Sequence, residues 1–373
     1  MEIILFLYFS FLLGIGVIAS KNVNNISDYY VGGKKLNYWI AALSARSTGE
    51  SGWLLLGVTG MGAVMGLSAF WIVLGEVIGV FLSWHFMAAK FKNLTDRYNS
   101  ITVPDFLHSH FNAKTNTIRI IAATALSAFV VIYVSAQIDI TGKTFESFLG
   151  YNYYNGIFIG FGIVVAYIFS GGFLAVAWSD IFQGSLMFVA LLILPIVAYF
   201  QLPTDTNFLQ GLRDIDPSLL NIWGDGGFNL LNAFSIIGLL SIGIGFLGSP
   251  QVYVRFIAIR DSEEIKKGKI VAVLYTLITS SSAVIIGMLG RFMFTKSNQS
   301  PEQILGGGGE NVLYLLLIDI MPNVIVGFYI AALLSAVMST VDSLLVVASS
   351  AVTRDFYQQI INPNADSQLL INL

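Results

Sequence analysis

Cysteine is absent from this chain of 373 residues, and histidine occurs only three times. Without cysteine the protein can form no disulfide, no cysteine-ligated iron–sulfur cluster and no thiol nucleophile, and three histidines argue against a zinc enzyme. Charge is scarce as well, because Lys, Arg, Asp and Glu make up only 11% of the residues, against about 25% in soluble domains. The net charge of −3 gives no indication of a nucleic-acid partner. A chain so poor in charge cannot cover itself with a polar surface, so we expect it to lie in a lipid bilayer.

Long apolar runs are abundant, and they predict helices that cross the membrane. A bilayer core needs roughly 20 apolar residues per helix, and continuous runs of this length favour helices over the alternating strands of a β-barrel. The first run lacks the basic start and the cleavage site of a signal peptide, so we interpret it as the first span. The sequence therefore predicts an all-α polytopic membrane protein. Its nine candidate spans lie near 3–19, 36–58, 66–92, 117–146, 153–171, 178–201, 231–257, 267–295 and 325–353.

The loops between these spans differ in basic residues. If the N-terminus is outside, 14 of the 19 Lys and Arg residues lie in inner loops or the tail, four lie in outer loops, and Arg46 lies within a span. Inner loops of membrane proteins carry the excess of positive charge. We therefore predict a multi-pass protein of the cell membrane with its N-terminus outside.

Two of the predicted spans are interrupted by polar or helix-breaking residues. The span at 36–58 contains the run 47–52, with the sequence STGESG, and the span at 231–257 contains three glycines and Pro250. Interrupted helices at corresponding positions of two halves indicate a binding site at the interface of inverted repeats. The five-span separation of these two helices predicts a transporter with such a site.

Ionisable residues within membrane spans are costly and are functional candidates by default. Arg46 and Glu50 are four residues apart, so they either neutralise each other or bind substrate. We interpret Asp139 and Lys143, at the same spacing, as a surface pair, and Glu76 as a structural residue.

Two further carboxylates have no basic residue three or four positions away on their own helices. These are Asp180 and Asp342. A buried carboxylate without such a neighbour is either protonated or held by a cation from elsewhere. A bound Na⁺ would satisfy it directly.

The last span carries small hydroxyl residues on one face. Ala336, Ser339, Thr340 and Ser343 follow the spacing i, i+3, i+4, i+7. Hydroxyl and carbonyl oxygens are hard ligands that suit hard cations, and the interrupted helix offers unpaired carbonyls at Ser47 and Glu50. The alternative is a seam of small residues at which helices pack closely.

Three stretches of the chain resemble the sodium:solute symporter family, and its sodium/proline branch in particular. They are Ser51-Gly52-Trp53-Leu54-Leu55-Leu56-Gly57, Gly171 to Asp180, and Ser335 to Tyr357. The resemblance implies one transmembrane domain with a leucine-transporter-like bundle of inverted repeats. Residues 1–35 would form an extra helix and inner loop, 36–201 the first repeat, 202–230 an outer loop, and 231–373 a partial second repeat.

The resemblance also implies a sodium site and a solute site. Sodium would be the coupling ion, no other cofactor would be needed, and the solute would be proline or a related amino acid. The branch has an Asp where Gly49 stands here, and Glu50 offers a charge in a different position. The implied sodium ligands are Ser47, Glu50, Ala336, Ser339 and Thr340, with a second site in some members at Asp180, Asp342 and Ser343; the implied solute residues are Ser51, Gly52, Tyr133, Gln137, Ile242 and Phe246, with Arg46 as a cation for a carboxylate.

The length of the chain leads to one further expectation. Members of the family continue for at least two more helices, so we expect a C-terminally truncated chain with an incomplete second repeat. A non-transporting remnant, a split subunit whose partner chain supplies the missing helices, and a sensory membrane domain all stay open. An enzyme is not expected, because the sequence shows no nucleophile–base pair and no phosphate-binding loop.

Overall fold

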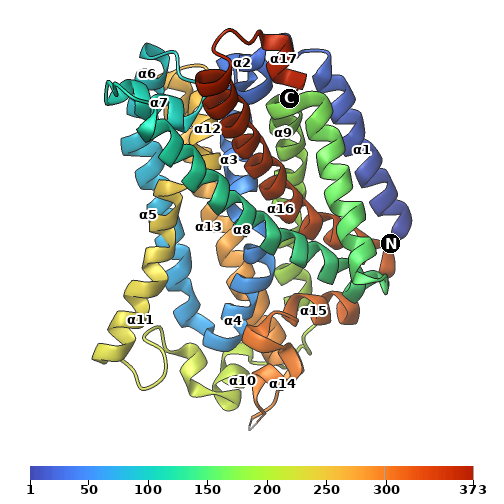
Figure 1. Ribbon diagram of the computed structural model, residues 1–373. Coiled ribbons are helices and arrows are strands. Elements are labelled where there is room, and N and C mark those ends of the chain that lie inside the picture. Colours follow the sequence, from blue (N-terminus) through green and yellow to red (C-terminus); the bar gives the residue numbers. More distant parts are fainter. Residues whose placement is uncertain (298, 373) are drawn as a thin grey trace.

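The computed structural model describes every residue except 298 and 373 and is almost entirely helical (Figure 1). The principal helices are α1 (Glu2–Ser20), α2 (Ile26–Val31), α3 (Tyr38–Trp53), α4 (Thr59–Met65), α5 (Phe70–Leu82), α6 (Ala88–Arg97), α7 (Val103–His110), α8 (Thr117–Leu149), α9 (Tyr153–Phe200), α10 (Phe208–Ile215), α11 (Leu230–Ser241), α12 (Pro250–Ala258), α13 (Ser262–Phe294), α14 (Pro301–Leu305), α15 (Val312–Ile320), α16 (Asn323–Ser350) and α17 (Ser367–Asn372). A 3₁₀ turn η6 (Ile242–Gly248) joins α11 to α12, and a π-helical segment η8 (Ala351–Ile361) continues α16.

Seven helical stretches among the described residues are long and apolar enough to cross a membrane. Two of them, Tyr38–Arg97 with 60 residues and Tyr153–Phe200 with 48 residues, far exceed the roughly 20 residues that one crossing needs. Each turns back on itself at a glycine with positive φ, Gly66 in the first and Gly172 in the second. Figure 1 shows α3 and α4 running down the bundle and α5 returning upward. The seven stretches therefore accommodate the nine predicted spans.

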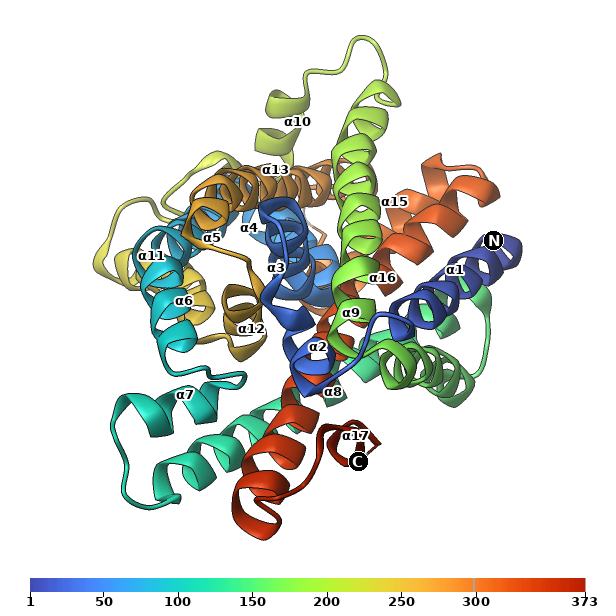
Figure 2. The ribbon, with the colours of Figure 1, turned by 90° about the horizontal axis from the view of Figure 1, so that it is seen from above.

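Helix α16 lies at the centre of the bundle. Of its apolar window 83% is buried, more than in any other candidate span of the described chain. It packs against α3, α8 and α9, and Figure 2 shows α3 in the middle of the molecule with α13 and α9 beside it. The hydroxyl face of the last predicted span therefore faces protein.

Both predicted interruptions are present in the structure. Helix α3 breaks at Ser51, which has φ 53° and ψ 179°, a backbone conformation that non-glycine residues rarely adopt. The second interruption converts the helix to the 3₁₀ turn η6 between α11 and Pro250. Helix α12 packs on α3, and η6 packs on α5, so the two broken helices lie at a common junction.

Glycines allow η6 to approach α5 closely. A Cβ atom built on Gly243 would lie 1.8 Å from the carbonyl oxygen of Gly75, and one built on Gly79 would lie 1.9 Å from the carbonyl oxygen of Gly243. Small residues at such crossings let membrane helices pack backbone against backbone. This contact fixes the position of the second broken helix.

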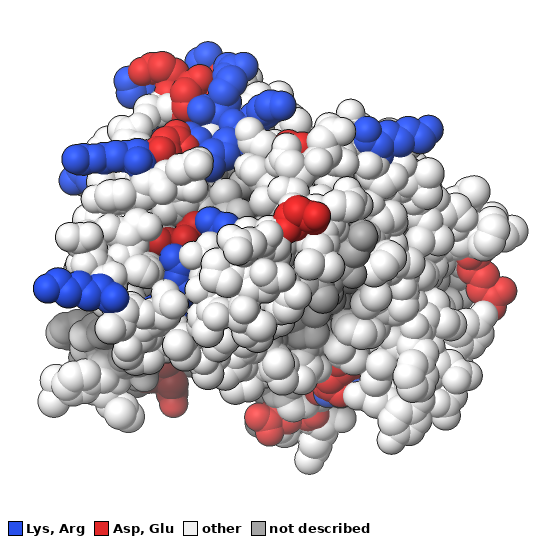
Figure 3. Space-filling model, turned by 45° about the horizontal axis from the view of Figure 1, so that its top comes forward, with Lys and Arg blue, Asp and Glu red and all other residues white. Residues whose placement is uncertain are grey.

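Basic side chains gather at one end of the bundle. Figure 3 shows most of the visible Lys and Arg residues at the end that carries α6 and α7, whereas acidic residues prevail at the opposite end. Helix α1 starts at about the middle height of the bundle in Figure 1 and runs from there toward the basic end.

We expect Gly243→Ala to destabilise the protein by about 1–3 kcal/mol, the usual cost of overpacking, because the methyl group would overlap the Gly75 carbonyl. Gly238→Ala on α11 is the matched control, since its Cβ would meet no atom within 4 Å. Thermal unfolding of the purified variants in detergent measures the difference. Equal midpoints for the two variants would contradict the close contact.

Candidate functional site

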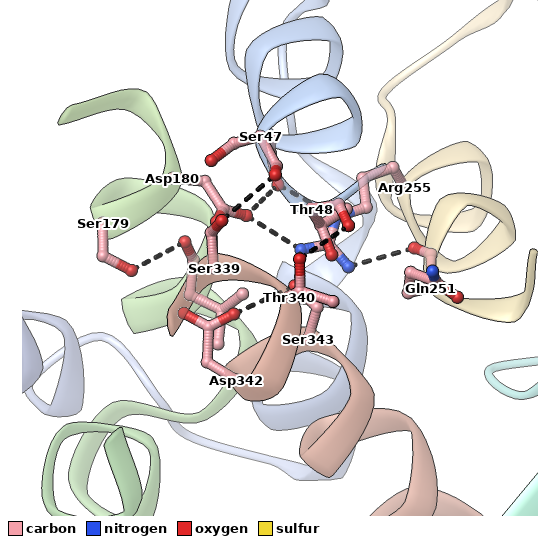
Figure 4. A network of polar contacts seen from close by, with 12 residues as sticks. Ser47, Thr48, Ser179, Asp180, Gln251, Arg255, Ser339, Thr340, Asp342 and Ser343 are labelled. Atoms are coloured by element: carbon pink, nitrogen blue, oxygen red, sulfur yellow. Dashed lines mark hydrogen bonds and ion pairs between the residues drawn. The ribbon is translucent and has the colours of Figure 1, made fainter. Parts of the chain in front are cut away.

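Hydroxyls of α16 meet backbone carbonyls of α3 just before its break. The Ser339 Oγ atom lies 3.1 Å from the carbonyl oxygen of Ser47, and the Thr340 Oγ1 atom lies 3.1 Å from that of Thr48 (Figure 4). Both hydroxyls also lie within 3.3 Å of the Ala336 carbonyl oxygen. The structure thus brings four of the five predicted sodium ligands together. We call this group of oxygen atoms the α3–α16 junction.

Glu50 is the member of the predicted set that lies elsewhere. Its carbonyl accepts a hydrogen bond from the Leu54 amide, and its side chain points to Arg46 and Thr279. The carbonyl that faces Thr340 belongs to Thr48, because the helix remains intact through Glu50 and breaks only at Ser51.

The α3–α16 junction has the donor set that a hard cation prefers. Its atoms are hydroxyl and carbonyl oxygens, and Ser339 and Thr340 are fully buried. Asp180 lies beside it, because Ser44, one turn before Ser47 on α3, donates a 2.5 Å hydrogen bond to its Oδ2 atom. The Oδ1 atom of Asp180 is buried without a hydrogen-bond partner among the described residues. A buried, unpaired carboxylate oxygen favours a cation here.

Asp180 nevertheless has a basic partner, which comes from α12. Arg255 Nη2 lies 2.8 Å from Asp180 Oδ2, and both side chains are completely buried. The guanidinium also donates to Ser44 and to Ser343 (Figure 4). Arg255 is one of the 14 basic residues that the orientation count assigned to inner loops or the tail, and this assignment was wrong, because α12 points its side chain into the bundle. The cation that holds Asp180 is therefore an arginine 75 residues away in the chain.

Asp342 completes the same polar network. Tyr167 of α9 donates a 2.6 Å hydrogen bond to its Oδ2 atom, and Ser343 donates to its Oδ1 atom. The three residues of the predicted second sodium site thus lie together, with Ser343 between Asp342 and the guanidinium of Arg255. An arginine side chain supplies positive charge at this position.

A cavity of about 920 Å³ adjoins the break of α3. Its walls come from α3, α5, α8, η6 and the loop near Gly308. The Gly52 amide, on the wall, donates a 3.2 Å hydrogen bond to Gln137 Oε1 across the break. Six of the seven predicted solute residues line this one cavity: Ser51, Gly52, Tyr133, Gln137, Ile242 and Phe246.

Arg46 is the predicted solute residue that does not line the cavity. Its Nη2 atom lies 2.9 Å from Glu50 Oε1, and its guanidinium carbon lies 4.9 Å from the ring centroid of Phe246. The predicted neutralisation of Arg46 by Glu50 is confirmed. The pair is buried, with both side chains at most 2% exposed, so Glu50 already balances the charge of Arg46.

The remaining charged residues divide between the surface and the cavity. Asp139 and Lys143 form the predicted surface pair at 3.0 Å, with side chains 43% and 56% exposed. Glu76, which we interpreted as structural, lines the cavity from the middle of α5 and accepts a 2.5 Å hydrogen bond from Ser280. The only sequence signal for the place of Glu76 on the cavity wall was that an ionisable residue lies deep within a membrane span.

A buried ion-pair cluster joins the helices at the basic end of the bundle. Arg119 of α8 lies 3.0 Å from both Asp105 of α7 and Asp355 of η8. Thr102, which caps α7, donates a 2.8 Å hydrogen bond to the same Asp355 carboxylate. These contacts hold α7, α8 and η8 together, on the opposite side of the junction from the loop near Gly308.

A helix bundle with two broken helices, an oxygen-lined junction and an adjoining cavity of solute size has the architecture of a secondary transporter. The sodium:solute symporter family model matches residues 29–372. The high-affinity proline transporter PutP of Bacillus subtilis is 35% identical over 97% of this chain and 75% of its own length. The sodium/proline symporter of Haemophilus influenzae is 30% identical over 98% of this chain and 72% of its own. A substrate-bound, outward-open Na⁺-coupled sialic acid symporter has the same fold, with a TM-score of 0.82 at 19% identity over 99% of this chain and 77% of that one.

The chain belongs to the sodium:solute symporter family and is a sodium-coupled transporter of a small solute rather than an enzyme. The comparisons do not bear out the expected C-terminal truncation: the relatives match over 96–98% of this chain, and the chain spans 68–75% of their own length. The same matches give no support to a partner chain, and the remnant and sensory alternatives are not favoured.

We expect Arg255→Gln to destabilise the protein by about 3–5 kcal/mol, because it leaves Asp180 as an unpaired buried charge. The double variant Arg255→Gln/Asp180→Asn should recover much of this loss. Thermal unfolding in detergent compares them, and Lys143→Gln, which breaks the exposed pair, serves as the control with little effect. A single variant as stable as this control would contradict the assignment of a buried pair.

Proposed function

We propose that the protein carries Na⁺ and proline, or a closely related amino acid, into the cell together. The observation that supports this most is the placement of residues 47–52 of α3. Ser47 and Thr48 contribute carbonyls to the α3–α16 junction, and Ser51 and Gly52 line the cavity a few residues further on. The relatives named as proline transporters support the choice of solute.

In this proposal Na⁺ binds at the α3–α16 junction, to oxygens of Ser47, Ala336, Ser339 and Thr340. The ion replaces hydroxyl–carbonyl contacts of 3.0–3.3 Å with stronger ion–oxygen interactions, so it holds α3 against α16. Because the break at Ser51 follows directly, the bound ion orders the cavity wall. The solute then binds to a wall that is already ordered, so its binding free energy no longer includes the cost of ordering that wall. Ion and solute therefore bind cooperatively.

We further propose that one Na⁺ accompanies each solute. In the second group of residues, Asp180 and Ser343 contact the guanidinium of Arg255, and Asp342 is linked to it through Ser343. The guanidinium already supplies a positive charge there. A Hill coefficient near one for Na⁺ is the corresponding expectation.

Alternating access is proposed to follow from movement of one repeat against the other. Residues 36–201 and 231–373 are the proposed repeats, with 1–35 as an extra helix and 202–230 as an outer loop, and the two broken helices lie where the repeats meet. The ion-pair cluster around Arg119 would separate when the inner side opens, since it links helices of both repeats.

Proteoliposomes test the proposed function directly. The purified chain should accumulate labelled proline when an inward Na⁺ gradient is imposed, and it should not do so when choline replaces Na⁺. A panel of unlabelled amino acids in competition identifies the preferred solute. Correctly inserted protein that shows no sodium-driven uptake of proline would reject proline as the solute.

We expect Ser339→Ala and Thr340→Ala each to raise the Na⁺ concentration for half-maximal uptake by about tenfold, corresponding to roughly 1.4 kcal/mol for one lost oxygen ligand. The control is Ser185→Ala, because the Ser185 hydroxyl is exposed and bonds only to its own helix, at Ile181. Sodium dependence measured in proteoliposomes gives the comparison. If both variants keep the wild-type dependence, sodium binds elsewhere.

The N-terminus is proposed to lie outside, on the acidic side of the bundle. Because the chain contains no cysteine, single cysteines can report the orientation. A membrane-impermeant maleimide should label Ser300→Cys in intact cells and should label Thr115→Cys only after permeabilisation; both positions are exposed. The reverse pattern would invert the orientation.

A further inference from the structure

The charged residues that line the cavity are all acidic in the described part of the chain. Glu50 and Glu76 lie on its wall and are each 3% exposed, and Glu310 lies on the loop near Gly308. Arg46 balances one of these charges and is not among the residues that line the cavity. The wall therefore carries a net negative charge while its carboxylates are ionised.

The two buried carboxylates are held at one place. Thr279 of α13 donates a 2.9 Å hydrogen bond to Glu50, and its neighbour Ser280 donates a 2.5 Å hydrogen bond to Glu76. Adjacent residues of one helix thus position both side chains, one from α3 and one from α5. The positions are set by tertiary contacts before any ligand arrives.

One carboxylate oxygen of Glu50 has no partner among the described residues and could accept a hydrogen bond from a ligand. Its Oε1 atom receives both Arg46 and Thr279, whereas its Oε2 atom is buried with no hydrogen-bond partner among the described residues. A buried carboxylate oxygen without a partner is energetically unfavourable, and a charge-assisted donor is the partner that satisfies it best.

We propose that Glu50 and Glu76 recognise a positively charged nitrogen of the solute, so the carrier selects solutes that carry an ammonium group. This inference rests on the proposed use of the cavity as the solute site. An N–H donor of the solute would bind Glu50 Oε2, with Glu76 contributing negative charge from α5. Aromatic rings of Tyr133 and Phe246 on the same cavity add favourable contacts for a cation.

The acidic wall also excludes a class of solute. Arg46 is paired with Glu50 and packed on Phe246, so no basic side chain among the described lining residues can neutralise an anionic solute. Organic acids without an amine meet uncompensated negative charge in this cavity. The selectivity is thus opposite to that expected if Arg46 faced the solute.

Two solute analogues provide the first test. Tetrahydrofuran-2-carboxylic acid keeps the ring and carboxylate of proline but has an oxygen in place of the ammonium nitrogen. Against labelled proline in proteoliposomes, we expect it to compete at least tenfold more weakly than unlabelled proline. Equal competition would overturn the proposal.

Two amide variants provide the second test. Glu76→Gln should raise the KM for proline at least tenfold and leave the Na⁺ concentration for half-maximal uptake within twofold of wild type, and the amide can still accept the Ser280 hydrogen bond. Arg46→Gln/Glu50→Gln removes the second carboxylate without leaving an unpaired arginine, so it keeps the test valid if Glu50→Gln alone does not fold. Asp139→Asn, in the exposed pair, is the matched control.

The outcomes separate this inference from the proposed function. A change in sodium dependence with an unchanged KM in these variants would show that the carboxylates bind the coupling ion, which would overturn the ammonium assignment. If the wild type takes up no proline, the proposed function fails on its own. Thermal stabilisation by a panel of charged amines and their uncharged isosteres then decides the inference, and equal shifts for both classes would overturn it.

Discussion

Backbone groups at membrane depth must find partners inside the protein, because lipid offers none. Helix α3 stops being regular at Ser51, in the middle of the bundle, and the groups on either side of that break are held from two directions. The carbonyls of Ser47 and Thr48 face the hydroxyls of α16, and the amide of Gly52 bonds to Gln137 of α8. The first set forms the α3–α16 junction, and the second lies on the cavity wall. The proposed ion site and the proposed solute site therefore lie on two sides of one irregular segment.

Charge around the α3–α16 junction and the cavity follows a simple pattern. Two arginines, Arg46 and Arg255, each pair with one carboxylate, Glu50 and Asp180. Breaking such buried pairs is costly, although the pairs themselves add little net stability. Near these two sites, two further carboxylates have no arginine of their own, Asp342 beside the junction and Glu76 beside the cavity. Each proposed cation, sodium at the junction and the solute ammonium in the cavity, would thus bind near one excess negative charge.

Local patterns explain what the sequence alone could predict. The apolar runs, the interruptions in α3 and η6, and the pairs at i, i+4 spacing all depend on neighbours within a few residues. The pairs Arg46–Glu50 and Asp139–Lys143 were found in this way. The residues on the cavity wall came from resemblance to the family, since no periodicity links Tyr133 on α8 to Phe246 on η6.

Tertiary contacts explain what the sequence could not predict. Arg255 pairs with Asp180, which lies 75 residues away in the chain. In the sequence Arg255 could not be distinguished from the neighbouring basic residues, which were assigned to an inner loop. The choice of Thr48 over Glu50 opposite Thr340 depends on the exact residue at which α3 breaks, which composition does not determine. The cavity position of Glu76 depends on how α5 packs against η6 and α13.

The central claim is that sodium at the α3–α16 junction orders the solute cavity. Equilibrium binding of labelled proline to the purified protein, measured over a range of Na⁺ concentrations, tests it without the complication of transport. The account predicts that Na⁺ lowers the Kd for proline and that proline lowers the Kd for Na⁺ by the same factor, as linkage requires. A Kd for proline that is the same in Na⁺ and in choline would contradict the account.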